Sequence, residues 1–547
     1  MKKHTPETHQ TRNRKRRSAM VAASLLAVVS LPAGLAPAVA ETLGTQAAGA
    51  VVNGDFSQGL NGWKATGDPA STTTTAEAGN AQLMQRLGAE GTVNLRQKTG
   101  TLAAGWWTVS ARVKAEGTLG ASRIGLKNCG VDGETVLPST AQDGAWLQIS
   151  ADAFVTKASC EIVIETRGTA GDWAIVDDVT LTPGSVQRAV RGADLSNLAK
   201  NEDKGAVYFD ANGRQVDAVQ AFADAGANLV RLKVWVDPAD GYNTTNEVVD
   251  TAKRAKAAGM KVLVDFHYSD RWTDPGAQGM PAAWVGLSPQ GVADAVYAHT
   301  FEVLTALKDA GVAADSVQVG NEINPGMLWP LGQTWDVFPQ DDVKGAQWDN
   351  LALFLSAGSR AAKDVSAQTD VILHLTNINN GIGGLTWWFD EVTKRGVQFD
   401  TIGLSYYGYW HGSMADLQHA ITTLSARYDR DVIVVENSYP FTLEDDPVDP
   451  WENVIRSQSQ LVPGYPATPA GQAANFRAVQ DVVASAPGGR GLGVVSWEPA
   501  WTAVPGNGWD PADPTTGNAW ENQAMLGFDG RALPALQEYA PDPAVKR

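Results

Sequence analysis

Ser316-Val317-Gln318-Val319-Gly320-Asn321-Glu322-Ile323-Asn324 joins the end of a strand to two polar side chains. Residues 316–319 are mostly apolar and β-branched, which is typical of a short buried strand. Only Gly320 separates this run from Asn321 and Glu322. The stretch therefore predicts an amide and a carboxyl group at the rim of a sheet or barrel.

A second apolar run, Asp431–Val435, also leads directly into a carboxyl group, that of Glu436, which is followed by Asn437. Two carboxyl groups on either side of the scissile bond are what most glycosidases use. One Asn-Glu pair would be weak evidence, but two strand-end glutamates on different strands indicate glycoside hydrolysis.

Short apolar runs alternate with amphipathic stretches from residue 189 onward. Eight runs predict strands: Val190–Leu195, Asn228–Val236, Lys261–His267, Ser316–Gly320, Val371–Thr376, Thr401–Tyr406, Asp431–Val435 and Gly493–Trp497. Between them, apolar residues spaced by three and four, as in Val248–Ala255 before Gly259, predict helices with glycine caps. The pattern predicts an α/β fold, a (β/α)8 TIM barrel over residues 188–540. An open doubly wound sheet is the alternative, but no glycine-rich phosphate loop follows the first strand.

Residues 48–184 have a different, all-β pattern. Trp106–Val113, Cys160–Glu165 and Trp173–Leu181 alternate with period two and are separated by Gly, Asn and Asp, which predicts a jelly-roll β-sandwich. Cys129 and Cys160 are the two cysteines of the chain, and in an exported protein we expect them to form a disulfide.

The N-terminal region also resembles the jelly-roll carbohydrate-binding modules that are appended to glycosidases. The resemblance lies in Asn53-Gly54-Asp55-Phe56 with a following Gly62-Trp63, and in Asp177-Asp178-Val179. Exposed aromatic side chains of such modules stack on sugars. For each candidate, the alternative to sugar stacking is a role in the core of the sandwich. The candidates are Trp63, Trp106, Trp107, Trp146 and Trp173. Asp55 and either Asp177 or Asp178 are candidates for binding a structural calcium ion. The alternative is that these carboxylates are solvated at the surface.

Residues 1–40 have the composition of a signal peptide: a basic start, an apolar run at Ala19–Leu35, and Ala38-Val39-Ala40 before the cleavage point. Removing their seven basic residues and one acidic residue changes the net charge from −17 to −23. So acidic a protein repels nucleic acid and anionic membranes. We expect a secreted, extracellular, soluble monomer that acts on a neutral substrate.

In a TIM barrel the active site lies at the carboxyl ends of the strands. Those ends concentrate polar and aromatic side chains: Asp194, Arg231, His267, Asn321, Glu322, Tyr407, Glu436 and Trp497. Glu498 also lies at a strand end, but between Trp497 and Pro499 we interpret it as a structural partner. No second histidine lies at ligand spacing from His267, so no catalytic metal is predicted.

These strand ends resemble the endo-β-1,4-galactanases, also called arabinogalactan hydrolases, of glycoside hydrolase family 53. The matching motifs are Gly192–Ser196, Arg231–Trp235, Asp265–Trp272, Gly320–Asn324 and Ser496–Trp501. The resemblance covers about residues 188–536 and implies cleavage of β-1,4-galactan, a side chain of plant pectin, without a cofactor.

In this reading Glu436 is the nucleophile and Glu322 the acid/base of a retaining mechanism, with carboxyl groups about 5–5.5 Å apart. The substrate-binding candidates are Asn321 on the sugar 2-hydroxyl, Arg231 beside Glu436, and His267, Tyr407, Trp497 and Asp194. The aromatic platforms expected along the cleft are Trp272, Trp329, Trp387, Trp388, Trp410, Trp497 and Trp501.

Two other readings remain open from the sequence. The first is a retaining β-glycanase for xylan, mannan or cellulose, and the second is a galactan-binding protein without catalytic activity. The acidic loop Glu444–Asp449 is expected to be solvated, with a structural calcium as the alternative.

Overall fold

The computed structural model describes residues 51–541 except 118–121, 139, 141–144, 158–159, 338–344, 450 and 514. The proposed signal peptide, residues 1–40, lies outside the described residues. None of the helices within them is long and apolar enough to cross a membrane.

Two antiparallel sheets make up the described part of residues 51–183. The first contains, in spatial order, β1 (Lys64–Thr66), β4 (Gly91–Lys98), β10 (Glu161–Gly168), β6 (Arg123–Lys127) and β8 (Gly133–Val136). The second contains β2 (Thr72–Glu77), β3 (Asn80–Arg86), β11 (Trp173–Pro183), β5 (Gly105–Glu116), β9 (Leu147–Val155) and β7 (Gly130–Val131). Alternate residues such as Val109, Ala111 and Val113 are buried, as expected for a sandwich. Cys129 and Cys160 form a disulfide.

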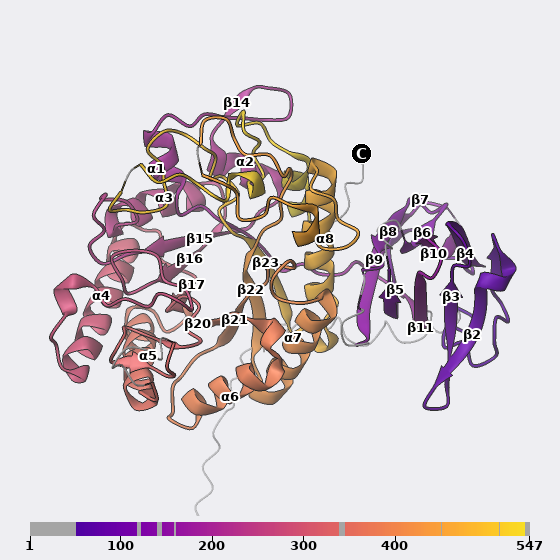
Figure 1. The fold of residues 1–547 in the computed structure, drawn as a ribbon, viewed down its shortest axis with the longest axis horizontal. Helices are drawn as coiled ribbons and strands as arrows, with labels where there is room; N and C mark the ends of the chain where they lie inside the picture. Colours follow the sequence, from indigo (N-terminus) through magenta and orange to yellow (C-terminus); the bar gives the residue numbers. More distant parts are fainter. Residues whose placement is uncertain are drawn as a thin grey trace, which may run out of the picture. The chain divides into compact units, whose positions relative to one another are not determined.

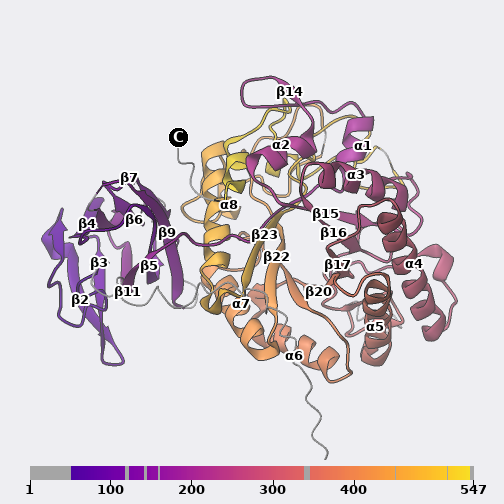
Figure 2. The same ribbon diagram turned by 180° about the vertical axis from the view of Figure 1, so that it is seen from behind.

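Eight parallel strands close into a barrel in the described part of residues 190–541, which confirms the predicted fold (Figures 1 and 2). They are β12 (Val190–Asp194), β15 (Leu229–Val234), β16 (Lys261–Phe266), β17 (Ser316–Val319), β20 (Asp370–Leu375), β21 (Thr401–Ser405), β22 (Asp431–Asn437) and β23 (Gly491–Ser496). Two short ribbons lie outside the barrel: β13 (Tyr208–Phe209) with β14 (Gln215–Val216), and β18 (Gly326–Met327) with β19 (Gly332–Gln333).

Helices surround the barrel strands, and polar caps define where several of them begin (Figure 1). They are α1 (Leu198–Asp203), α2 (Ala218–Ala225), α3 (Thr245–Ala257), α4 (Pro289–Asp309), α5 (Trp348–Val365), α6 (Ile382–Thr393), α7 (Met414–Tyr428) and α8 (Pro469–Ala484). Asp217, Ser288, Ser413 and Thr468 each accept a hydrogen bond from a main-chain N–H of the first turn. Gly226 ends α2 in the left-handed conformation, at φ 109°.

The barrel interior changes from apolar to polar along β15, β16 and β20. Leu229, Leu263, Ile372, Ile433, Val435 and Val495 form an apolar cluster of their own. Side chains two residues apart on a strand share a face, so Arg231, Asp265 and His374 lie above Leu229, Leu263 and Ile372. All three polar residues are almost completely buried. The apolar layer therefore supports a polar layer at the carboxyl ends of the strands.

Candidate active site

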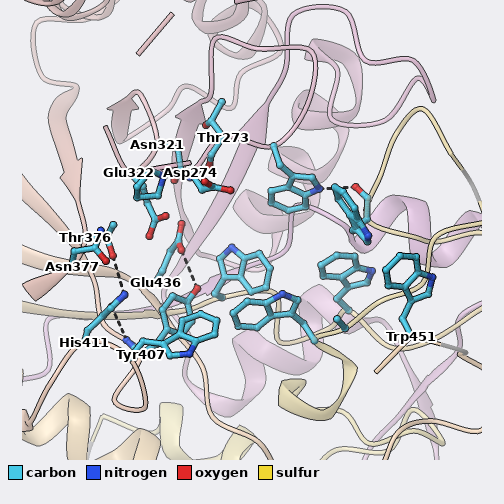
Figure 3. A pocket seen from close by; sticks show the side chains of 18 residues that line it. Thr273, Asp274, Asn321, Glu322, Thr376, Asn377, Tyr407, His411, Glu436 and Trp451 are labelled. Carbon is cyan, nitrogen blue, oxygen red and sulfur yellow. Dashed lines mark hydrogen bonds between the residues drawn. The ribbon is translucent and has the colours of Figure 1, made fainter. Parts of the chain in front are cut away.

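Glu322 and Glu436 line one cavity at the carboxyl ends of the barrel strands. Its volume is about 560 Å³, and its lining includes Asn321, Tyr407 and Trp497 (Figure 3). Ser405 Oγ lies 2.6 Å from Glu322 Oε1 and 3.5 Å from Glu436 Oε2. These two oxygens are thus at most about 6 Å apart, which favours the retaining spacing of about 5–5.5 Å over the wider inverting one.

Two donors hold the carboxyl group of Glu436. Arg231 Nη2 and Tyr407 Oη each donate to its carboxylate at 2.9 Å. Arg231 is fixed in turn by Asp194, 2.6 Å from its Nη1, and by Asp265, 2.9 Å from its Nη2. A guanidinium with several carboxylate partners keeps its orientation, so Arg231 fixes Oε1 of Glu436 while Tyr407 holds Oε2.

Glu322 follows β17 in a strained conformation. Its φ is 48°, a left-handed value that residues other than glycine rarely adopt. Such values persist where the surrounding structure determines them, and they are common at functional sites. The main-chain N–H of Ile323 donates to His374 O at 3.0 Å, which helps to hold this turn. The conformation directs the Glu322 side chain to the cavity.

The environments of the two glutamates give their carboxyl groups different pKa values. Burial and the nearby Glu436 carboxylate raise the pKa of Glu322. Burial also raises the pKa of Glu436, but the Arg231 cation and the Tyr407 hydroxyl oppose this rise. Glu436 therefore ionises first and Glu322 keeps its proton, which is the division between a nucleophile and a general acid.

The predicted binding residues lie at two depths. Asn321, Tyr407 and Trp497 line the cavity. Asp194, Arg231 and His267 are not among its lining residues and are almost completely buried. His267 lies 3.0 Å from Asp265 and accepts from the N–H of Thr273 at 3.2 Å. These three side chains therefore lie behind the residues that line the cavity and support them. Direct contact between the three and a substrate stays a prediction.

Asn321 connects the cavity lining to the buried residues behind it. Its Oδ1 accepts from Arg231 Nη2 at 2.8 Å, and its Nδ2 donates to the carbonyl oxygen of Thr273 at 2.8 Å. The amide group is therefore oriented by the same arginine that orients Glu436.

Indole rings form one wall of the cavity, and Figure 3 shows them between the labelled Glu436 and Trp451. The lining tryptophans are Trp272, Trp410, Trp451, Trp497, Trp501, Trp509 and Trp520. Trp272 stacks on Trp501 at 6.0 Å between ring centroids, and Lys233 Nζ lies 3.7 Å from the centroid of Trp272. Aromatic rings held in this way offer flat apolar surfaces to sugar rings.

Three of the predicted platforms do not line this cavity: Trp329, Trp387 and Trp388. Trp388 is 1% exposed, and its indole N–H donates to the carbonyl oxygen of Ile323. Trp387 is 45% exposed and packs on Trp335 and Trp348. Trp451, Trp509 and Trp520, which the sequence did not single out, take their place, because long loops without any periodicity bring them to the cavity.

Sequence reasoning assigned no role to the polar residues behind the glutamates, namely Gln318, His374 and Ser405. Gln318 and His374 occupy inward positions of β17 and β20, and both are fully buried. Their polarity at inward positions one residue before the end of a mostly apolar strand was the available signal.

Glu498 has the structural partner that its position suggested. Lys233 Nζ lies 3.1 Å from Glu498 Oε1, and the N–H of Asn197 donates to Oε2 at 3.1 Å. Lys233 and Glu498 are both buried.

The acidic loop uses its carboxylates as acceptors for main-chain N–H groups. Asp445 accepts from Asn453, Asp446 from Val448, and Asp449 from Trp451. Among the described residues, no group of three His, Cys, Asp or Glu side chains is placed to hold a metal ion. A solvated loop stays the prediction and a structural calcium ion its alternative, which metal analysis after mild dialysis would test.

Comparisons with known proteins agree on the barrel. The family model described as glycosyl hydrolase family 53 matches residues 190–539. An arabinogalactan endo-beta-1,4-galactanase of Cellvibrio japonicus is 38% identical over 363 residues, which cover 64% of this chain and 90% of that protein. An endo-beta-1,4-galactanase of Bacillus subtilis is 33% identical over 384 residues, covering 64% and 85%. A solved Ignisphaera aggregans GH53 catalytic domain is 35% identical with a TM-score of 0.60, covering 65% of this chain and 97% of that one.

Proposed function

This chain belongs to glycosyl hydrolase family 53, and we propose that it is an endo-β-1,4-galactanase that cleaves internal bonds of galactan or type I arabinogalactan. The single observation that carries the proposal is the pair of glutamates. Arg231 and Tyr407 hold Glu436 and oppose the rise of its pKa that burial causes, while burial and the Glu436 carboxylate raise the pKa of Glu322, which faces the same cavity. The named relatives support the choice of galactan.

The reaction proceeds by double displacement. Glu436 attacks the anomeric carbon as Glu322 gives its proton to the leaving oxygen, and a covalent glycosyl-enzyme forms. Glu322, now ionised, then takes a proton from the water that attacks the same carbon and releases Glu436. Asn321 is placed beside Glu436 to bind the sugar hydroxyl next to the anomeric carbon, and the tryptophans support the rings of neighbouring sugars.

Reducing-sugar release from purified β-1,4-galactan tests this function, with xylan, mannan and cellulose in parallel. We expect short oligosaccharides from galactan alone. Glu322→Gln and Glu436→Gln should abolish release, whereas Glu391→Gln on the outer surface of α6 should not. Release from another glycan would show that this glycan, and not galactan, is the substrate. Binding of galactan without release of reducing sugar would favour a galactan-binding protein without catalytic activity.

We propose that the N-terminal sandwich binds sugar through the outer face of its second sheet. Trp146 and Trp173 are half-buried there. The cations of Arg112 and Lys114 lie 4.9 and 4.8 Å from the Trp146 ring centroid, and Trp173 Nε1 donates to Glu116 at 3.0 Å. Aromatic rings among polar side chains suit a sugar ligand. Trp146→Ala in a Glu322→Gln background should weaken retention on insoluble galactan, whereas an unchanged affinity would reject this face.

We also propose that the protein is secreted and acts as a monomer. The signal-like pattern of residues 1–40 and the disulfide between Cys129 and Cys160 support export. N-terminal sequencing of the secreted form should begin near Glu41, and light scattering should give the mass of one chain. Retention of residues 1–40 in the cell-associated protein would contradict export.

A further inference from the structure

Ser405 contacts both catalytic carboxylates. It ends β21, is 0% exposed, and its Oγ lies 2.6 Å from Glu322 Oε1 and 3.5 Å from Glu436 Oε2. A serine hydroxyl carries one hydrogen and can donate it to only one of them at a time. The mechanism described above gives this residue no role.

His374 determines which way the Ser405 hydrogen points. The main-chain N–H of Glu322 and the side-chain amide of Gln318 lie 3.3 and 3.0 Å from His374 Nδ1. Asn321 Oδ1 is also 3.0 Å away, but Arg231 and Gln318 already lie within donor distance of its two lone pairs. Because a main-chain N–H can only donate, Nδ1 is an acceptor and the ring proton lies on Nε2.

That proton is donated to Ser405. His374 Nε2 lies 2.8 Å from Ser405 Oγ, and burial keeps the pKa of His374 well below its usual value, so the ring stays neutral. With its oxygen already accepting from His374, the hydroxyl has the two carboxylates left as partners. A directed chain thus runs from the Glu322 N–H through His374 and Ser405 to the Glu322 carboxylate.

We propose that Ser405 is a positioning residue that stabilises the negative charge of Glu322 as this acid gives up its proton. The hydrogen turns toward Glu436 while Glu322 is protonated. It turns to Glu322 as the proton passes to the leaving oxygen, the glycosidic bond breaks and Glu436 forms the covalent ester. Ser405 transfers no proton itself. This inference depends on the proposed function, because it concerns the same pair of glutamates.

The two distances make the effect unequal. The 2.6 Å contact to Glu322 is a short, charge-assisted hydrogen bond when Glu322 is ionised, whereas 3.5 Å to Glu436 is at the limit of hydrogen bonding. Glu436 has Arg231 and Tyr407 as closer donors. Removing the hydroxyl should therefore act mainly on Glu322 and on the step in which it loses its proton.

Other charged and titratable groups near the two carboxylates remain when Ser405 is changed. Those facing Glu322 and Glu436 from the surrounding strands and loops are Asp194, Arg231, Asp265, His267, Asp274, His374, Tyr407 and His411. A shift in the pH profile of a Ser405 variant then reports the lost hydroxyl rather than a lost charge.

The test compares Ser405→Ala, Ser405→Thr and Ser438→Ala. Ser438 is also buried and directly follows β22, but it donates to Gln523 rather than to either glutamate. Ser405→Ala should lower kcat/KM on galactan about ten- to a hundred-fold, as expected for a hydrogen bond to a charged group. It should also move the alkaline limb of the pH profile of kcat/KM up by about one pH unit, because the hydrogen bond that is lost lowers the pKa of Glu322. Ser405→Thr keeps the hydroxyl and should retain the wild-type limb, as should Ser438→Ala.

A dinitrophenyl β-galactooligosaccharide separates acid catalysis from a general loss of structure, because its leaving group needs no proton. Ser405→Ala should hydrolyse this substrate at nearly the wild-type rate. An unmoved alkaline limb, or equal losses on both substrates, would overturn the proposal. Wild-type failure on galactan would reject the proposed substrate instead, and the limb would then be measured on whichever glycan the protein hydrolyses.

Discussion

Arg231 Nη2 lies 2.9 Å from Glu436 Oε1, and this buried ion pair orders the active site. The same guanidinium donates to Asn321 and is held by Asp194 and Asp265. One side chain thus fixes both the nucleophile and a candidate contact to the sugar.

Replacing Arg231 should therefore change both the rate and the pH dependence. In Arg231→Met the pKa of Glu436 rises because its cation is gone, so the acid limb of kcat/KM moves to higher pH. Arg231→Lys keeps the charge but not the planar fork, and we expect kcat to fall about 10²–10³-fold with little movement of the limb. Arg254→Lys on α3 serves as the control, because Arg254 forms its ion pairs with Glu202 and Asp217. An unmoved acid limb in a folded Arg231→Met variant would contradict the assigned electrostatic role.

Tyr407→Phe tests the second donor to the nucleophile. The variant loses the 2.9 Å hydrogen bond to Glu436 Oε2 but keeps the ring that lines the cavity. A hydrogen bond to a charged group contributes about 1.5–3 kcal/mol, so we expect kcat to fall roughly ten- to a hundred-fold with KM nearly unchanged. Tyr439→Phe removes a buried hydroxyl that donates to the carbonyl oxygen of Tyr465, and it should leave kcat unaltered. Equal effects of the two changes would indicate a merely structural Tyr407.

The strands could be predicted closely because their pattern is local. Residues 316–320 were expected to form a strand and Ser316–Val319 does; Val371–Thr376 was expected and Asp370–Leu375 is observed. The strand-end glutamates followed from the same pattern, since a barrel gathers the carboxyl ends of its strands on one face.

The remaining parts of the site depend on tertiary structure. Trp388 lies on a helix face that the barrel covers, so its ring is buried rather than presented to a substrate. Trp451 and Trp509 reach the cavity from irregular loops, where no periodicity indicates direction. His374 meets Ser405 only because β20 and β21 are adjacent in the closed barrel.

Trp451→Ala tests the outer part of the indole wall. Trp451 lines the cavity and is 42% exposed. Loss of a sugar-stacking ring should raise KM for galactan several-fold, while kcat for a substrate bound near the glutamates changes little. Trp387→Ala is the matched control, because Trp387 is similarly exposed at 45% but does not line the cavity. A KM that rises equally in both variants would show that the cavity wall is not where the chain binds.

The buried pair of Lys233 and Glu498 gives a prediction about stability. Lys233→Met leaves Glu498 without its cation in a fully buried place, and breaking such a pair typically costs about 3–5 kcal/mol. Glu498 then takes up a proton, because burial already raises the pKa of this carboxyl group. Urea denaturation, followed by the circular dichroism of the barrel helices, measures the loss.

The double variant Lys233→Met/Glu498→Gln separates the lost charge pair from lost packing. It removes both charges, so it should recover much of the stability that Lys233→Met loses. Lys253→Met breaks the exposed pair with Asp250, whose side chains are 51% and 74% exposed, and should cost less than about 1 kcal/mol. If Lys233→Met lowered the free energy of unfolding no more than Lys253→Met does, the buried pair would contribute nothing to stability.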